Sequence, residues 1–477
     1  MSSLSALDSL LSSSSASSAI NLSAILQAAT GAASPGIDVN SAVNSTITAA
    51  EAPEQNWEDQ QSTLQSQTSA LNQIQSDVTN LDNVAQSLNN LTGPLSATTV
   101  STSNSSIITG SSAPGSTLGN NIVVVNSLAT TASWSSNVLT SESTLLPPET
   151  FTITTASGAT ATVTTGNGVN TLSDLVKAIN GDNLGLNASI VTDATGSRLA
   201  ITSHTSGSAA DFTVTSSVPN SSFSLSQAVA GVNASLTING IAIESATNTV
   251  TGAVPGLTLS LQSASPGTEV SLSVAPDTAQ VSNSINQFVS DYNTLIGDVN
   301  TQFTDTGSGE GVLADDPGIQ SLQSDLLQSL DYTATPASGS STTTVPNLSS
   351  LGISVNSDGT LSLNNTTLSN ALQNNFSDVQ NFFQGSALNG FANSLDQQLT
   401  SFISPADGAF TLDLQSINSQ NTDLQDDITN FQTNIIAPLK TQLQAEFSKA
   451  EIALQQLPNE IRSVDAELGI NTGSSGG

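Results

Sequence analysis

Apolar residues recur every three or four positions in two stretches at opposite ends of this 477-residue chain, residues 51–95 and 412–468. This spacing places apolar side chains along one side of an α-helix, where they can pack against a partner helix. We therefore expect the two chain ends to pair as a helical leg. The apolar positions assigned to this pairing, called the terminal seam below, are Trp57, Leu64, Leu71, Ile74, Val78, Leu81, Leu88, Leu424, Ile428, Phe431, Ile435, Leu443, Phe447, Leu454 and Leu457.

The terminal seam allows two interpretations. Its residues can close a helical bundle inside one protomer, or they can also pack between protomers. Long, mostly polar helices with a narrow apolar stripe bury little core of their own, which favours the second interpretation. Trp57 and Phe431 lie on the stripe, where aromatic residues are more often core than ligand-stacking groups.

The spacing of the terminal seam changes near its C-terminal end. Between residues 435 and 447 the apolar residues follow one another at steps of four, and Pro438 lies inside this interval. A four-residue stutter unwinds a coiled coil locally, and proline removes an intrahelical hydrogen bond and clashes with the preceding turn. We expect a joint at residues 437–440, followed by a separate mobile segment that becomes ordered on docking.

The middle of the chain has a different pattern. Between residues 97 and 280, short runs of apolar and β-branched residues are bounded by Gly, Asn and Ser, as expected for strands with one buried face. One helix interrupts them, since Thr171 and Asp174 have the spacing of a capping box. Further along, Asp358-Gly359 lies between two apolar runs and predicts a hairpin over residues 352–363.

These patterns predict a multidomain α+β protein in which two β-rich head domains are inserted into a discontinuous helical leg, with flexible termini. The predicted parts, in chain order, are a disordered docking segment (1–45), the N-terminal part of the leg (46–96), an outer β-rich head domain (97–232) with a small module at about 150–217, an inner β-rich head domain (233–280), the C-terminal part of the leg (281–437) and a helical docking segment (438–477). Residues 97–110 and 190–232 are candidates to complete the inner head domain.

Charge excludes several classes of partner. The chain has 38 acidic residues and 5 basic ones, and its net charge is −33. Binding to nucleic acid or to an anionic membrane surface needs a basic footprint, so we expect neither. The chain has no cysteine and no apolar run of 18 residues that could span a membrane. No Lys or Arg precedes Lys177, so we expect no cleaved secretory signal peptide.

Residues that could carry chemistry are few. His204 lies in a Ser/Thr-rich β segment with no neighbouring pattern that would orient a catalytic base. Asp315-Asp316 precedes Pro317, so a helix cap is a better interpretation than a metal pair. Asp426-Asp427 lies in a helical stretch and is typical of a solvated face, while residues 165–168 are Gly-rich but lack the Lys of a phosphate loop. We expect no catalytic, cofactor-binding or metal-binding residues, no cofactor and no enzyme activity.

Several motifs in order resemble one known family, the bacterial flagellar filament-capping proteins, also called flagellar hook-associated protein 2. The segments that carry this resemblance are Pro35-Gly-Ile-Asp-Val-Asn-Ser41, Gly119-Asn-Asn-Ile-Val-Val-Val-Asn-Ser-Leu-Ala129, Ala253-Val-Pro-Gly-Leu-Thr-Leu259, Phe288-Val-Ser-Asp-Tyr-Asn293, Asp358-Gly-Thr-Leu361 and Phe447-Ser-Lys-Ala-Glu451. Residues 150–217 are similar to the small module of flagellins and hook-associated proteins. The chain departs from the family in its Ser-rich extension before Pro35 and in Pro458, which interrupts the family's terminal helix.

The resemblance implies a non-enzymatic assembly factor on the extracellular tip of the flagellum. Such proteins form a ring, a pentamer or hexamer, that retains exported flagellin and promotes its folding and insertion, so that the filament elongates and the cell swims; some also support adhesion. The implied partners are other copies of the chain, flagellin, the hook–filament junction proteins and an export chaperone on the C-terminal segment, and export follows the flagellar type III route. Two alternatives remain open, namely a surface adhesin or glycan-binding protein on a helical stalk, and a flagellin-like filament subunit.

Overall fold

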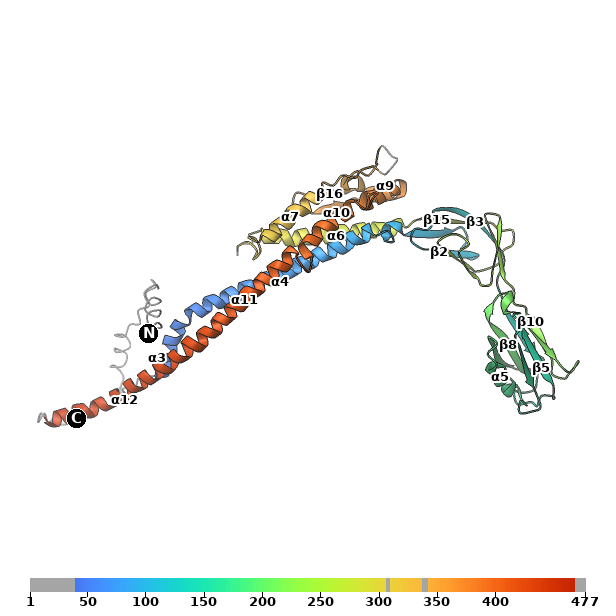
Figure 1. Ribbon diagram of the computed structural model, residues 1–477, viewed down its shortest axis with the longest axis horizontal. Coiled ribbons are helices and arrows are strands. Elements are labelled where there is room, and N and C mark those ends of the chain that lie inside the picture. The colour runs from blue at the N-terminus through green and yellow to red at the C-terminus, as the bar shows by residue number, and fades with distance from the viewer. Residues whose placement is uncertain (1–38, 306–308, 337–341, 468–477) are drawn as a thin grey trace, which may run out of the picture. The chain divides into compact units, whose positions relative to one another are not determined.

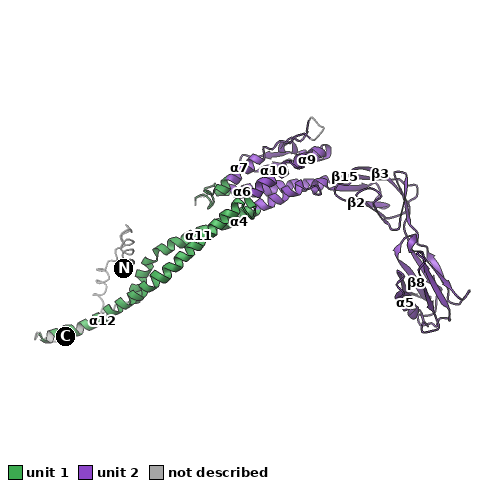
Figure 2. Cartoon of the chain, in the orientation of Figure 1, with its two compact units in different colours: residues 1–76, 301–320, 402–477 green, residues 77–300, 321–401 purple. Residues whose placement is uncertain are grey.

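The computed structural model describes residues 39–305, 309–336 and 342–467 (Figure 1). The chain forms two compact units (Figure 2). Unit 1 contains Met1–Ser76, Thr301–Gln320 and Phe402–Gly477, and unit 2 contains Asp77–Asn300 and Ser321–Ser401. Helices occupy both ends of the described chain and strands occupy its middle, which confirms the predicted α+β class.

Long helices dominate unit 1. These are α3 (Val39–Ala50), the first part of α4 (Ala52–Asn89), α11 (Ala409–Phe431), a π-helical turn η4 (Gln432–Ile436) and α12 (Ala437–Glu467). α3 begins six residues before the end of the segment that we expected to be disordered, because Val43 and Ile47 are buried on its inner face. The remainder of that segment, residues 1–38, lies outside the described residues.

Unit 2 contains a helical part with an aromatic core. Its elements are the rest of α4, most of α6 (Thr278–Gln302) and α7 (Pro317–Ser329), η3 (Leu348–Leu351), β16 (Ile353–Val355), β17 (Leu361–Leu363), α8 (Asn365–Asn374), α9 (Phe376–Gln384) and most of α10 (Phe391–Ile403). Phe391 stacks on Phe382 at 5.4 Å between ring centroids and meets Phe288 edge-on at 5.6 Å. The predicted hairpin is present, and Gly359 supplies the positive φ that its turn needs.

The first β-rich part of unit 2 is a pair of sheets with one shared core. One sheet has the order β1-β15-β3-β11-β12 and the other β13-β14-β2. The strands are β1 (Thr98–Thr102), β2 (Ile108–Ser112), β3 (Gly119–Ser127), β11 (Ala234–Ile238), β12 (Ile241–Ser245), β13 (Thr249–Thr251), β14 (Leu257–Leu261) and β15 (Val270–Pro276). Alternate residues, such as Val123 and Val125 on β3 and Leu257 and Leu259 on β14, meet in this core.

The second β-rich part lies between β3 and β11 in the chain. One sheet has the order β10-β4-β8-β7 and another β6-β5-β9, with helix α5 (Leu172–Gly181) packed against them. The strands are β4 (Thr131–Ser136), β5 (Thr150–Thr155), β6 (Thr160–Thr164), β7 (Leu186–Asp193), β8 (Gly196–Ser206), β9 (Phe212–Ser216) and β10 (Leu225–Val229). Thr171 and Asp174 form the predicted capping box at the start of α5, which confirms that interpretation.

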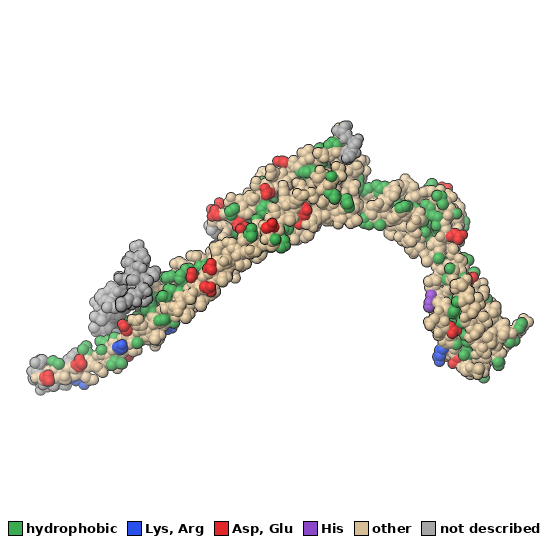
Figure 3. Space-filling view, in the orientation of Figure 1, with side chains coloured by type: hydrophobic (Ala, Val, Ile, Leu, Met, Phe, Trp, Pro, Cys, Tyr) green, Lys and Arg blue, Asp and Glu red, His purple; other side chains and the backbone are tan. Residues whose placement is uncertain are grey.

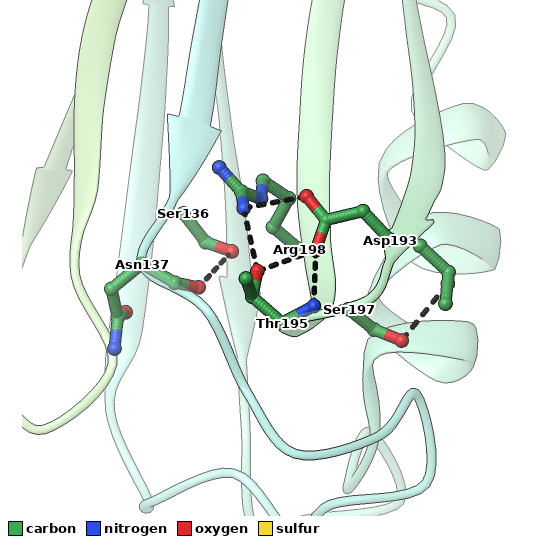
Figure 4. A network of polar contacts seen from close by, with 7 residues as sticks. Ser136, Asn137, Asp193, Thr195, Ser197 and Arg198 are labelled. Atoms are coloured by element: carbon green, nitrogen blue, oxygen red, sulfur yellow. Dashed lines mark hydrogen bonds and ion pairs between the residues drawn. The ribbon is translucent and has the colours of Figure 1, made fainter.

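An ion pair closes the β7–β8 turn in this second part (Figure 4). Arg198 contacts Asp193 at 2.9 Å, and Thr195 donates its backbone N–H and its hydroxyl to the same carboxylate. These Thr195 hydrogen bonds, followed by the nearby Arg198 charge, lower the pKa of Asp193. The network is local to one hairpin, so it stabilises a turn and presents no open site.

Candidate assembly interface

The helices from the two chain ends pair antiparallel in unit 1. Trp57 on α4 meets Phe431 at the end of α11 edge-on, with ring centroids 5.4 Å apart. One turn further along α4, the Gln61 side chain donates to the Asn421 carbonyl and to the Gln425 side chain, each at 3.4 Å. Gln432 donates to the carboxylate of Glu54, which is 8% exposed. This antiparallel packing of helices from the two chain ends is the arrangement that the spacing of the terminal seam predicts.

A second pairing joins α3 to α12 (Figure 1). Val43, Ile47 and Ile436 are buried together. The partly buried residues around them are Val39, Ala50, Phe431, Leu439, Leu443 and Phe447. Since both α3 and α12 contribute apolar residues, the first turns of α12 are packed and belong to the same core as α3.

The π-turn η4 explains the change in seam spacing. The Ala437 N–H donates to the Gln432 carbonyl, a five-residue step that replaces the four-residue step of an α-helix. From Phe431 the seam therefore continues five residues on, at Ile436, which is buried, while Ile435 is 42% exposed. One inserted residue rotates the helix by about 100°, and this rotation aligns Leu439 and Leu443 with α3.

The expected joint at residues 437–440 is not a break. The backbone remains helical from Ala409 through η4 and α12 to Glu467, and Leu439 packs against α3 instead of starting a separate segment. Pro438 has no N–H to donate, and it lies two residues after the π-turn, where the hydrogen-bonding pattern is already altered. Pro458, the other proline in this stretch, also lies within helical backbone.

Burial divides the terminal seam into three groups. The fully buried members, at 6% exposure or less, are Leu71, Ile74, Val78, Leu81, Leu88 and Ile428. The half-buried members are Trp57, Leu64, Leu424, Phe431, Leu443, Phe447 and Leu454. Ile435 and Leu457 are exposed, the latter at 49%. The half-buried and exposed members, together with Ile452 and Val464 on α12, leave apolar surface that a further partner could cover.

An open groove runs between α4 and α11 within unit 1. Its volume is about 480 Å³. Leu64 and Leu424 line it together with Gln60, Thr63, Gln67, Gln420, Asp423 and Asp427. In Figure 3 acidic side chains outnumber basic ones on the face shown, and most of that face is backbone and side chains that are neither hydrophobic nor charged. The groove therefore offers a partner a narrow apolar floor with amide and carboxylate walls.

The other residues singled out from the sequence lie in caps, turns or exposed positions. Asp316 accepts the N–H groups of Gly318 (2.8 Å) and Ile319 (3.1 Å), so it caps α7 as predicted. Burial and the Asp316 charge raise the pKa of Asp413. Asp426 and Asp427 are exposed, and His204 is exposed on β8. Residues 165–168 form a turn in which Gly166 and Gly168 have positive φ.

The described residues contain neither a metal-binding cluster nor a membrane-spanning helix. Within residues 39–305, 309–336 and 342–467, no group of three or more His, Cys, Asp or Glu side chains could hold a metal ion. In the same ranges no helix has the length and apolar content needed to cross a membrane.

Comparison with known proteins identifies the family. The model described as "Flagellar hook-associated protein 2 N-terminus" matches residues 35–132, and the corresponding "C-terminus" model matches residues 231–459. A third model, "Flagellin hook IN motif", matches residues 150–205. The first two models together cover most of the chain and include both sides of the terminal seam.

Individual relatives agree with these matches. The B-type flagellar hook-associated protein 2 of Pseudomonas aeruginosa is 27% identical over 205 residues, which are 40% of each chain, so this chain spans well under half of that curated relative.

One solved structure shows a similar fold. The D1-D2-D3 domains of the Escherichia coli flagellar cap protein superpose with a TM-score of 0.56 at 24% identity, covering 73% of this chain and 99% of that one. The corresponding Pseudomonas aeruginosa structure matches 42% of this chain and 98% of its own, at 24% identity and a TM-score of 0.35. Because the two family models match residues 35–132 and 231–459, the chain belongs to the flagellar hook-associated protein 2 family.

Proposed function

We propose that this chain caps the flagellar filament, as a ring of copies at the extracellular tip that retains exported flagellin and promotes its folding and insertion. The observation that carries the proposal is the set of half-buried and exposed members of the terminal seam in unit 1, on helices that come from both chain ends: Trp57, Leu64, Leu424, Phe431, Ile435, Leu443, Phe447, Leu454 and Leu457. The helix pair leaves this part of its apolar stripe accessible to solvent, so the surface gains stability when another chain covers it.

The partners follow from this arrangement. Neighbouring copies and the filament end are the chains that the half-buried seam would meet, and the ring is a pentamer or hexamer. Before export, the exposed apolar residues of α12 need protection, which an export chaperone on the C-terminal segment would supply. The hook–filament junction proteins form the surface on which the ring first assembles, and export follows the flagellar type III route.

The surfaces of the β-rich parts are suited to weak, non-catalytic contacts with flagellin subunits as they leave the export channel. Only 9% of residues are charged, and the exposed strand positions are rich in Ser and Thr. Uncharged hydroxyl surfaces form hydrogen bonds that exchange readily with water, so contacts with an emerging flagellin would be weak and reversible. This role needs no catalytic group, and we propose that the chain is not an enzyme.

Gene deletion with complementation tests the proposal. A deletion strain should release flagellin monomers into the medium and build no filaments, and the wild-type gene should restore filaments seen by electron microscopy. Complementation with Leu457→Glu should fail, whereas Gln455→Glu, on the opposite side of the same helix, should restore growth. Normal filaments with lost surface attachment would indicate an adhesin, and a filament that lacks this chain along its length would exclude a flagellin-like subunit.

A further inference from the structure

A buried carboxylate pair joins α4 to α10 inside unit 2. Asp82 on α4 is 5% exposed, and Asp396 on α10 is half-buried. The Gln86 side-chain amide donates to Asp82 Oδ2 at 2.8 Å and to Asp396 Oδ1 at 3.0 Å, so one nitrogen bridges both acids. Asp82 Oδ1 is buried and has no hydrogen-bond partner in the described chain. The terminal-seam pattern does not account for this pair.

No positive charge on the surrounding helices compensates these two acids. The helices α4, α6, α7, α8, α9 and α10 contain no Lys, Arg or His. The other ionisable side chains on the parts of these helices that belong to unit 2 are Asp77, Asp291, Tyr292, Asp298, Asp325 and Asp378. Every group on these helices that could become charged is therefore an acid, and two ionised carboxylates at this contact would repel each other without relief.

The hydrogen-bond inventory points to a proton between them. Two ionised carboxylates offer only acceptor atoms, and the single Gln86 nitrogen is the donor that both share. A protonated Asp82 would add the missing donor, since its hydroxyl could donate to Asp396. A metal ion fits less well, because the Gln86 N–H groups already occupy one oxygen of each carboxylate.

We propose that Asp82 and Asp396 share one proton and act as a pH-sensitive latch, which holds α10 against α4 and loosens when the proton leaves. Burial, followed by the hydrogen bond and charge of Asp396, raises the pKa of Asp82 to about 7, with the Gln86 hydrogen bond opposing. The latch therefore titrates near neutral pH. When it opens, the proton passes to solvent and the two carboxylates repel across the α4–α10 contact.

The sign of the stability effect follows from linkage. The folded chain holds the Asp82 proton up to about pH 7, whereas an unfolded chain loses it near the ordinary value of 3.8. Between these limits the folded state binds more protons, so stability falls as pH rises from about 4 to 7 and then levels off. The pH dependence of stability has an upper limit of about a tenfold change in the unfolding equilibrium constant per pH unit. Solvent that reaches Asp396 reduces the effect below this limit.

Urea unfolding of the full chain between pH 5 and pH 8, with and without Asp82→Asn, tests the latch. The side-chain amide that this substitution introduces would donate to Asp396 as the protonated acid does, so the variant should equal wild type at pH 5 and exceed it at pH 8. Asp59→Asn removes a charge from an exposed position of the same helix and should keep the wild-type pH dependence. Infrared difference spectra at neutral pH should show a protonated carboxyl band in wild type that Asp82→Asn abolishes.

Two results would overturn the latch. The first is an equal pH dependence of wild type, Asp82→Asn and Asp59→Asn, which would assign the effect to general charge repulsion. The second is stabilisation of wild type at pH 8 by Ca²⁺ or Mg²⁺ that chelator reverses and that Asp82→Asn lacks, which would make the pair a cation site.

Discussion

Ile435 and Ile436 are adjacent in the chain but lie in opposite environments, and truncating each of them tests the π-turn. Ile436 is 8% exposed in the cluster with Val43 and Ile47, whereas Ile435 is 42% exposed. Replacing a buried Ile by Ala costs about 2–5 kcal/mol. The small size of this cluster places Ile436→Ala near 2 kcal/mol, and Ile435→Ala should cost well under about 1 kcal/mol.

Amide hydrogen exchange measures the difference in stability between the two variants at the α3–α12 contact itself, because α3 and α12 can separate without global unfolding. About 2 kcal/mol corresponds to roughly 30-fold faster exchange of the α3 amides in Ile436→Ala, since 1.4 kcal/mol is a factor of ten. Ile435→Ala is the matched control and should leave those amides within a few-fold of wild type. A regular α-helix would carry the seam through Ile435 instead, so faster exchange in Ile435→Ala than in Ile436→Ala would refute the π-turn and the phase shift derived from it.

Three further substitutions have defined outcomes. Trp57→Ala removes the edge-on contact with Phe431 and should destabilise unit 1 by about 1–3 kcal/mol, measured by urea unfolding. The cost arises because the substitution removes both buried aromatic area and the ring partner of Phe431. Trp57→Phe, which keeps an aromatic ring, should recover most of the loss. Pro438→Ala should change helical circular dichroism little and stabilise by less than about 1 kcal/mol, since the helix already continues past this position; a large gain in helicity would restore the predicted joint. Gly207→Ala should lower stability by about 1–3 kcal/mol, because φ at Gly207 is +99° and an added Cβ would lie 2.8 Å from the Ala246 carbonyl oxygen. An unchanged melting temperature would contradict this backbone constraint.

Local signals in the sequence were sufficient for several elements. The Thr171–Asp174 capping box and the Asp358-Gly359 hairpin depend on residues close together in the chain, so spacing alone locates them. The β3 run of Val residues is equally local. In contrast, β4 has the sequence Thr-Ala-Ser-Trp-Ser-Ser and weak strand propensity, and it is a strand because β8 and β10 pair with both of its edges.

Two features depend on tertiary packing and were not predicted. The spacing of five from Phe431 to Ile436 beside Pro438 is a signal for the π-turn, but a three-or-four template selects Ile435 instead. Asp82 follows Leu81 in a helix that is mostly polar outside its seam, so its burial against α10 cannot be read from periodicity. The spacing of apolar residues in the sequence predicts the terminal seam. Its division into buried and half-buried members depends on how many helices surround each turn, which the spacing does not show.

Site-specific photo-crosslinking in assembled flagella tests the central claim most directly. A photoreactive side chain at Leu457, which is 49% exposed on α12, should crosslink to flagellin or to a second copy of this chain. The same group at Gln455, about 200° around the helix, should crosslink far less. Equal or absent crosslinking at the two positions would contradict the proposal that the half-buried seam is the assembly interface.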